Sequence, residues 1–262
     1  MKNENSNKES WEIRSVNSEN NYKSVLFKRF PDSLNNHIHN FHKKIILENI
    51  PDQADLKVLD VGCGYGRNTL SLIERNKNCN VTGTDISENF VEQYKLNTGK
   101  LAFCGSIEEF PNDIGKFDRI VCVTVLMYVE KKDIDKAIQN LLSHLENNGK
   151  LILIEPLISG RAFSNGFGLL NLFLKKENTT GGNCFSSNEL INLIIKNGGT
   201  ILKEKRIPVT TIFIIPFYLL SLTLGYKLMG SILKGVGKAD SVLSNFKLPS
   251  LYASMIVRKK HL

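Results

Sequence analysis

The chain has 262 residues, of which 42% are hydrophobic and 23% are charged. These fractions are typical of a globular protein, so they exclude a wholly disordered chain, a collagen and a coiled coil. The five cysteines are an odd number without a CxxC pair, which argues against a disulfide framework or zinc knuckle and favours a reducing cytoplasm. The first residues, MKNENSNKESWE, contain no apolar core of a secretory signal.

The net charge of +8 is unevenly distributed along the chain. Residues 51–156 carry 12 basic and 16 acidic side chains, whereas residues 157–262 carry 14 basic and 4 acidic ones. A basic C-terminal third indicates an anionic partner there, which could be a substrate, a nucleic acid or a lipid surface.

The N-terminal part divides into two segments. Residues 1–21 are mostly polar, and we expect them to be disordered. Residues 22–55 form an N-terminal helical segment, because the apolar side chains from Ser33 to Ile50 recur at steps of three and four.

The middle of the chain alternates between strand and helix patterns. The predicted strands are Lys57–Val61, Asn80–Asp85, Leu101–Cys104, Phe117–Val123 and Lys150–Glu155. The predicted helices are Asn68–Arg75, Ser87–Asn97 and Lys132–Glu146, the last of them closed by Asn148 and Gly149. This alternation predicts βαβ units and therefore an α/β domain with a doubly wound parallel sheet.

Two further strands, Thr200–Arg206 and Tyr252–Arg258, are predicted near the C-terminus. The main domain over 56–262 then contains insertions at about 157–185 and 208–248. Before the first of the two strands, Ser186 and Glu189 form a capping box that opens a helix.

The most informative segment is the turn VLDVGCGYGRN that follows the first predicted strand. Glycines at a strand–helix turn allow positive φ and a close approach of a ligand, and the following helix offers free N–H groups to an anion. The acid at Asp60 would repel a pyrophosphate but would suit a cationic ligand. A second acid, Asp85, ends the next strand, where a carboxylate can accept both hydroxyls of a ribose.

These residues resemble the class I S-adenosylmethionine-dependent methyltransferases. The family's acid-GxGxG motif matches Asp60–Gly66, and its ribose-binding acid matches Asp85. The segments Phe103–Pro111, Phe117–Val129 and Asn148–Pro156 are similar to the adenine-binding stretch and to the fourth and fifth strands, in the family's order. The family often has an Asp where Ser106 stands in this chain.

The resemblance implies a Rossmann-like sheet of seven strands in the order 3-2-1-4-5-7-6, with the last strand antiparallel and a helical cap insertion. It implies S-adenosyl-L-methionine as the cofactor. The residues it assigns to cofactor binding are Asp60, Gly62, Cys63, Gly64, Gly66, Asn68, Asp85, Ile86, Ser106, Ile107, Val123 and Arg29. The resemblance also implies that residues 22–55 form a lid over the cofactor. Arg29 would bind the methionine carboxylate from this N-terminal lid, or it lies in a solvated basic turn.

Two side chains are candidates for catalysis, Tyr128 and Glu155, because strands four and five open there onto the cofactor crevice. The alternative is that Tyr128 packs on the cofactor and that Glu155 caps a loop. The Asn/Asp-Pro-Pro-aromatic motif of base and glutamine methylation is replaced by Val123-Thr-Val-Leu126, which argues against a nucleic-acid substrate. No metal site is expected, although His37, His39 and His42 form an HxHxxH pattern.

The segment Val209–Tyr226 is uncharged and long enough to cross a membrane. Pro216 and its place between two strands of one sheet argue against a crossing. It could be a helical cap over the active site, a peripheral membrane contact through residues 203–238, or part of the core or of a dimer interface.

The sequence therefore predicts a methyltransferase that acts on an O or N atom of a small-molecule or lipid-like metabolite by in-line transfer. The alternatives are a membrane-surface lipid or quinone methyltransferase and a non-catalytic cofactor-binding module. We expect the protein in the cytoplasm, with or without peripheral membrane contact.

Overall fold

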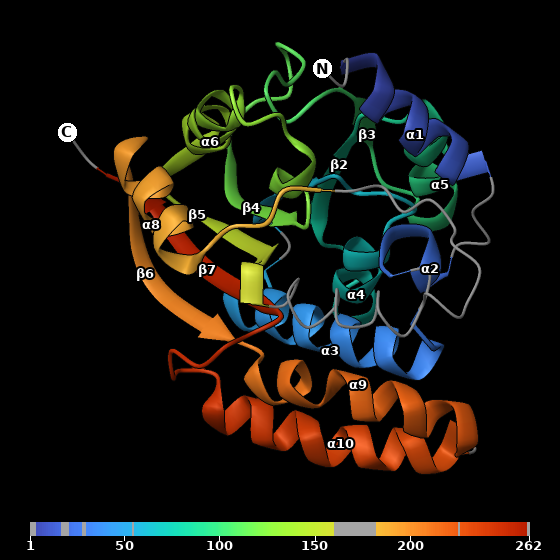
Figure 1. Ribbon diagram of the computed structural model, residues 1–262. Coiled ribbons are helices and arrows are strands. Elements are labelled where there is room, and N and C mark those ends of the chain that lie inside the picture. Colours follow the sequence, from blue (N-terminus) through green and yellow to red (C-terminus); the bar gives the residue numbers. More distant parts are fainter. Residues whose placement is uncertain are drawn as a thin grey trace.

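The computed structural model describes residues 4–16, 21–27, 30–53, 55–159, 182–224 and 226–260. Within these ranges, seven strands form one sheet in the order β3-β2-β1-β4-β5-β7-β6 (Figure 1). β7 pairs antiparallel with β5 and β6, and the remaining pairs are parallel. The predicted α/β fold class, strand order and antiparallel last strand are confirmed.

The strands are β1 (Lys57–Val61), β2 (Asn80–Asp85), β3 (Ala102–Cys104), β4 (Phe117–Val123), β5 (Leu145–Pro156), β6 (Gly199–Arg206) and β7 (Tyr252–Lys259). The helices are α1 (Glu4–Val16), α2 (Tyr22–Val25), α3 (Asp32–Asn49), α4 (Arg67–Arg75), α5 (Glu88–Thr98), the 3-10 helix η1 (Leu126–Tyr128), α6 (Ile134–Ser143), α8 (Ser187–Lys196), α9 (Pro208–Thr223) and α10 (Tyr226–Leu243).

Two apolar layers hold helices to opposite faces of the sheet. Ile152 and Ile154 of β5 belong to the layer that contains α3, α9 and α10, whereas Leu151 and Leu153 belong to the layer that contains α6 and α8. Successive side chains of a strand point to opposite faces, and both faces of this sheet are covered. This explains why the central strands are apolar runs rather than alternating ones.

The boundary between α6 and β5 differs from the prediction. α6 ends at Ser143 and β5 begins at Leu145, so Asn148 and Gly149 lie inside the strand and do not cap the helix. The pairing of β4 with β5 shifts register in this region. A Cβ atom at Gly149 would lie 2.9 Å from the carbonyl oxygen of Phe117, so glycine here permits a close backbone approach rather than a helix end.

The N-terminus also differs from the prediction. Residues 4–16, expected to be disordered, form α1, which packs against α5 (Figure 1). Polar composition predicts disorder when apolar burial is too small. This helix is instead held largely by polar contacts to α5, which a reading of composition does not detect.

The two expected insertions have different outcomes. Residues 160–181 of the first lie outside the described residues, and the capping box at Ser186 and Glu189 beside it is confirmed. The second insertion contains the helices α9 and α10, of which α10 packs on both α3 and α9. No helix in the described ranges is long and apolar enough to cross a membrane.

Candidate active site

A cavity of about 400 Å³ lies at the carboxyl ends of β1, β2 and β4. In a parallel sheet this edge collects the loops that follow the strands, which is where ligands of such folds bind. The structure brings ten predicted site residues to its wall: Gly62, Cys63, Gly64, Asn68, Asp85, Ile86, Ser106, Ile107, Val123 and Tyr128.

The glycine loop is shaped by positive φ angles at Gly62 (64°), Gly64 (53°) and Gly66 (98°). Residues with a side chain rarely adopt a positive φ, so the sharp turn from β1 into α4 requires glycine. A Cβ atom at Gly64 would also lie 2.9 Å from Cγ1 of Val25, and Val25 lines the cavity. The absent side chain at Gly64 therefore lets the loop lie close to Val25 in the wall of the cavity.

Asp85 is held in place by backbone amides on both sides of its carboxylate. Its Oδ2 accepts from Gly64 N at 2.9 Å, and its Oδ1 accepts from Ser87 N at 3.0 Å. The side chain is 8% exposed and lines the cavity. Burial raises the pKa of Asp85, whereas these two hydrogen bonds lower it. The effect of burial is the larger one, so the pKa is about 6. A carboxylate fixed in this way can accept hydroxyl groups of a ligand without reorganising.

Three residues predicted to bind the cofactor are not among the described residues of the cavity wall. Asp60 lies behind the loop, where it accepts from Thr69 Oγ1 at 2.8 Å, and burial raises its pKa to about 6. Gly66 is the N-cap of α4. Neither of these two residues lines the cavity in this structure, and their direct contact with a ligand stays a prediction. Arg29 lies outside the described residues.

Glu155 is also absent from the cavity wall. Its carboxylate is fully buried and accepts from the backbone N of Val125, Leu126 and Met127 at 2.9, 2.9 and 3.2 Å. The catalytic expectation is therefore replaced by the alternative, in which Glu155 caps a loop. Burial raises its pKa to about 8, against the three amide donors.

The loop that Glu155 caps presents Thr124 and Tyr128 to the cavity. Thr124 has φ of 58°, an unfavourable angle for a β-branched residue. Strained residues of this kind concentrate at ligand sites, where the surroundings hold them. The three amide contacts to Glu155 directly after Thr124 supply that support, and they keep Tyr128 in the wall.

The helix α1 forms a further wall of the cavity, although the sequence did not indicate it as part of a site. Asn7, Lys8 and Trp11 line the cavity. Asn7 Nδ2 donates to the carbonyl oxygen of Tyr128 at 2.8 Å, and the ring of Trp11 packs edge-on against Tyr128 with centroids 4.9 Å apart. The lid expected from residues 22–55 is thus formed mainly by α1, with Val25 of α2 beside it.

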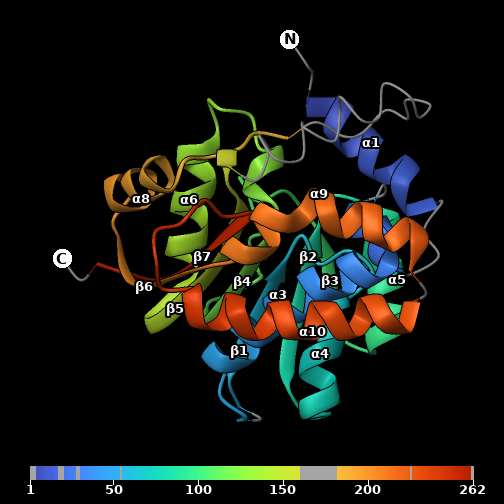
Figure 2. The ribbon, with the colours of Figure 1, turned by 60° about the horizontal axis from the view of Figure 1, so that its bottom comes forward.

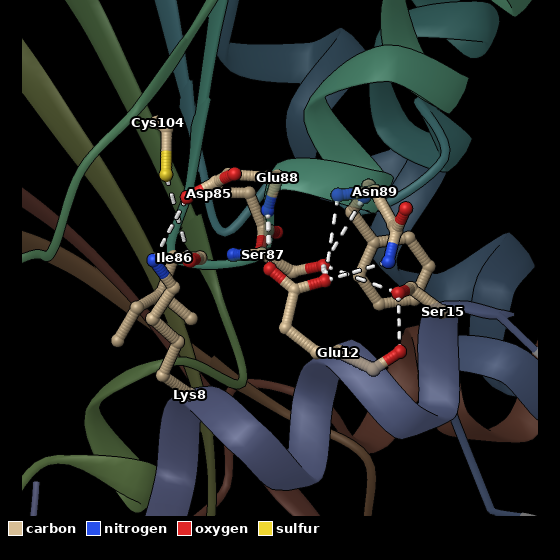
Figure 3. A network of polar contacts seen from close by, with 10 residues as sticks. Lys8, Glu12, Ser15, Asp85, Ile86, Ser87, Glu88, Asn89 and Cys104 are labelled. Carbon is tan, nitrogen blue, oxygen red and sulfur yellow. Dashed lines mark hydrogen bonds and ion pairs between the residues drawn. The ribbon is translucent and has the colours of Figure 1, made fainter. Parts of the chain in front are cut away.

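A polar network attaches α1 to the N-terminus of α5 (Figure 3). Glu12 accepts from Glu88 N at 2.7 Å, from Ser87 Oγ at 2.9 Å and from Asn89 Nδ2 at 2.9 Å. A carboxylate at a helix N-terminus satisfies free N–H groups and complements the helix dipole. Because Ser87 also donates its backbone N–H to Asp85, the lid is attached to the loop that positions this acid.

Arg67 is a further residue of the cavity that the sequence did not indicate. It is a lining residue of the cavity, and its Nη1 lies 2.9 Å from His39 Nδ1 and 3.4 Å from His42 Nδ1. Burial and the nearby Arg67 lower the pKa of His39 to about 3, so this ring is a neutral acceptor. Among the described residues, Arg67 forms no ion pair with a carboxylate. A cation in the first turn of α4 opposes the helix dipole, and this is the signal that could have singled it out.

The histidine pattern HxHxxH on α3 divides between two sides of the helix. His39 and His42 face Arg67, whereas His37 Nε2 lies 2.7 Å from Thr210 Oγ1 at the start of α9. The three rings therefore do not converge on one point, and their contacts position Arg67 and α9.

α9 and α10 contribute no described residue to this cavity. They pack on the far side of α3, as both ribbon views show (Figures 1 and 2). The expectation that Val209–Tyr226 caps the active site is corrected accordingly. Because α3 lies between α9 and the glycine loop, the apolar segment covers α3 and the sheet instead.

Comparison with known proteins identifies the class to which this site belongs. Residues 58–149 match the family model described as a methyltransferase domain. That segment contains the glycine loop, Asp85 and the strand β4. The match and the sheet order agree with the class I S-adenosylmethionine-dependent methyltransferase fold that the sequence resemblance implied.

Particular relatives act on different acceptors. The ribosomal RNA small subunit methyltransferase C of Buchnera aphidicola is 27% identical over 168 residues, which cover 60% of this chain and 49% of the relative. The ubiquinone biosynthesis O-methyltransferase of Rickettsia prowazekii is 34% identical over 113 residues, covering 41% and 43%. The chain spans about half the length of the curated relatives it matches.

Among solved structures, the magnesium protoporphyrin IX methyltransferase of Synechocystis with bound SAH has a TM-score of 0.56 at 16% identity. The match covers 87% of this chain and 86% of that one. At this identity the similarity concerns the fold, and it extends beyond residues 58–149 to most of the chain.

Proposed function

We propose that the chain is an S-adenosylmethionine-dependent methyltransferase that methylates an O or N atom of a small-molecule or lipid-like metabolite. The observation that carries the proposal is the position of Asp85. It is a buried carboxylate at the end of β2, held by the glycine loop and lining a cavity of about 400 Å³. A cavity of this size suits a nucleoside-sized ligand.

The donors and acceptors of the cavity fit the parts of this cofactor. In the proposal Asp85 accepts the two ribose hydroxyls, and the segment with Ser106 and Ile107 lies along the adenine. Arg67 and the N–H groups at the start of α4 bind the methionine carboxylate, because a buried guanidinium without a carboxylate partner among the described residues suits such an anion. This gives Arg67 the role that the sequence resemblance implied for Arg29.

When bound, S-adenosylmethionine supplies a methyl group on a positively charged sulfur. A lone pair of the acceptor O or N forms the new bond to the methyl carbon while the carbon–sulfur bond breaks, and the acceptor loses a proton. The protein's part is to align the acceptor and exclude water. In the proposal Trp11 and Tyr128 do this, because their rings pack together in the wall of the cavity.

Two observations favour a small or lipid-like acceptor. The strained turn after β4 contains Thr124 and Val125 in place of the proline motif of base methylation. The helix α1 packs against Tyr128 and covers part of the cavity. A cavity that is partly covered by a helix suits a compact acceptor better than a folded nucleic acid.

Two measurements test the proposal. Calorimetry with S-adenosylhomocysteine tests for the cofactor site, and we expect binding that competes with S-adenosylmethionine. Incubation of cell extract with methyl-labelled cofactor, with and without the protein, followed by mass spectrometry tests for turnover and identifies the labelled product. Binding without any protein-dependent label would support the alternative of a non-catalytic cofactor-binding module. No binding of either ligand would reject both.

A further inference from the structure

The helices α9 and α10 form a pair on the outer side of α3 (Figures 1 and 2), and none of their described residues lines the cofactor cavity. Their relative position is fixed by Asp240 of α10, whose Oδ1 accepts from Val209 N at 2.6 Å at the start of α9. Thr210 Oγ1 also donates to Asp240 Oδ2. The pair is therefore a preformed surface, since α10 caps the N-terminus of α9.

One side of α9 is buried and the opposite side is exposed and apolar. Ile214 and Phe217 face the core, at 0% and 7% exposure. The exposed side chains recur at steps that place them on one face of a helix. They are Ile212, Phe213, Pro216, Leu219, Leu220 and Thr223, and we call this set the α9 stripe.

The α9 stripe contains no ionisable group, and its large members are well exposed. Phe213 is 49% exposed and Leu219 is 44% exposed. Single exposed apolar residues are normal, but an aligned row of them on one helix marks a surface that contacts an apolar partner.

One exposed face of α10 carries three lysines. Lys227, Lys234 and Lys238 are exposed and spaced by seven and four residues, so they lie along one face of this helix. We call them the α10 lysines. Asp240 is the only acid of α9 and α10, and it is 3% exposed because it caps α9. The face therefore presents positive charge that no acid of either helix neutralises.

A cavity of about 590 Å³ between α3 and α10 extends this basic surface. Lys227 and Lys234 line it together with Lys44 of α3 and Lys205 of β6. Of these, Lys205 forms an ion pair with Glu48 at 2.7 Å, and Lys44 donates to Ser241. The small residues Gly230 and Gly237 of α10 leave the space open.

From this arrangement we infer that α9 and α10 bind in the plane of an anionic lipid bilayer, with the α9 stripe among the acyl chains and the α10 lysines at the headgroups. An apolar helix face beside basic residues is the pattern of in-plane membrane binding. Each lysine near an anionic surface adds about 1 kcal/mol. The inference concerns a surface outside the cofactor cavity, so it does not rest on the proposed function.

Charge favours a bilayer over a second copy of the chain as the occupant. In a symmetric dimer the same patch meets itself. Two copies of the α10 lysines would then face each other, and like charges across an interface cost several kcal/mol. An anionic bilayer has the complementary charge and an apolar interior beneath it.

The test is flotation of the full chain with vesicles of phosphatidylcholine alone and with vesicles containing 30% phosphatidylglycerol. We expect the protein to float only with the anionic vesicles, and less at 0.5 M than at 0.05 M salt because salt screens the lysines. Protein that stays with the bottom fraction in both cases would overturn the inference.

Two variants separate the contribution of the α10 lysines to vesicle binding from that of the α9 stripe. Lys227→Glu/Lys234→Glu/Lys238→Glu should lower the partition coefficient at least about 100-fold, from about fivefold for each lysine. Phe213→Ser/Leu219→Ser/Leu220→Ser should lower it at least about tenfold. The controls change exposed residues elsewhere in the chain: Lys77→Glu/Lys116→Glu/Lys131→Glu and Leu96→Ser/Leu101→Ser/Ile195→Ser.

Unchanged circular dichroism and an unchanged midpoint of urea unfolding would show that each variant is folded. If the stripe variant floats like its control, the inference fails. It also fails if sedimentation shows that the stripe variant converts a dimer into a monomer while vesicle binding is unchanged, because the occupant is then a second copy.

Discussion

The carboxylate of Glu12 lies 2.7 Å from the backbone N of Glu88, and this contact joins the lid helix α1 to the first turn of α5 (Figure 3). Asp85 stands just before that turn and shares Ser87 with the same network, since Ser87 donates its N–H to Asp85 and its hydroxyl to Glu12. The helix α1 and the proposed ribose acceptor are thus joined through one residue, Ser87.

Substitution of Glu12 by alanine should weaken the binding of S-adenosylhomocysteine about 5- to 30-fold. The change removes an acceptor from the helix N-terminus, which is worth about 1–2 kcal/mol. Calorimetry measures the affinity, and faster amide exchange across residues 4–16 would report the release of α1. Glu9→Ala is the control, because Glu9 is an exposed acid of the same helix. Equal effects of the two changes would contradict the proposal that Glu12 holds α1 on α5.

Substitution of Asp85 by asparagine should weaken S-adenosylhomocysteine binding by about 1.5–3 kcal/mol, the usual loss for hydrogen bonds to a charged group. Because the pKa of Asp85 is about 6, protonation should also weaken binding to the wild type as the pH falls below 6. Calorimetry between pH 5 and 8 should show this dependence in the wild type and a flatter profile in the variant. Asp113→Asn, at an exposed site, is the control.

Substitution of Arg67 by methionine should discriminate between two ligands. S-adenosylhomocysteine carries the amino-acid carboxylate, and methylthioadenosine lacks it. We expect at least tenfold weaker binding of the first and a change below threefold for the second, because only the first uses the charge-assisted hydrogen bonds. Arg119→Met is the control, since Arg119 donates to the carbonyl oxygen of Asn49 away from the cavity. An equal loss of affinity for both ligands would show that Arg67 has only a structural role.

Substitution of Glu155 by glutamine should lower the free energy of unfolding by about 1–3 kcal/mol near pH 6, because an NH₂ group then faces backbone donors. The pKa of Glu155 is raised to about 8, so the wild type binds its proton more tightly when folded. Wild-type stability from this group is therefore lost as the pH rises through 8. Urea unfolding at pH 6 to 9 should show the gap between the two proteins narrowing. A gap independent of pH would disprove the assigned titration.

Local patterns in the sequence were sufficient to predict the sheet and the glycine loop. The period of apolar residues distinguishes strand from helix, and the order of βαβ units leaves few topologies. Gly62 and Gly64 were recognisable because few other residues tolerate their positive φ. Asp85 was recognisable because it ends a parallel strand at the edge where ligands bind.

Contacts between distant segments were decided only by the tertiary structure. Composition gave no reason for Glu12 to order residues 4–16, because its partners at Ser87 and Glu88 lie far along the chain. The sequence left Glu155 open between catalysis and capping, and only the fold brings its carboxylate to the amides that follow Thr124. Hydrogen-bonding groups and charges act through space, so their partners depend on how the elements pack, whereas the period of apolar residues is written along the chain itself.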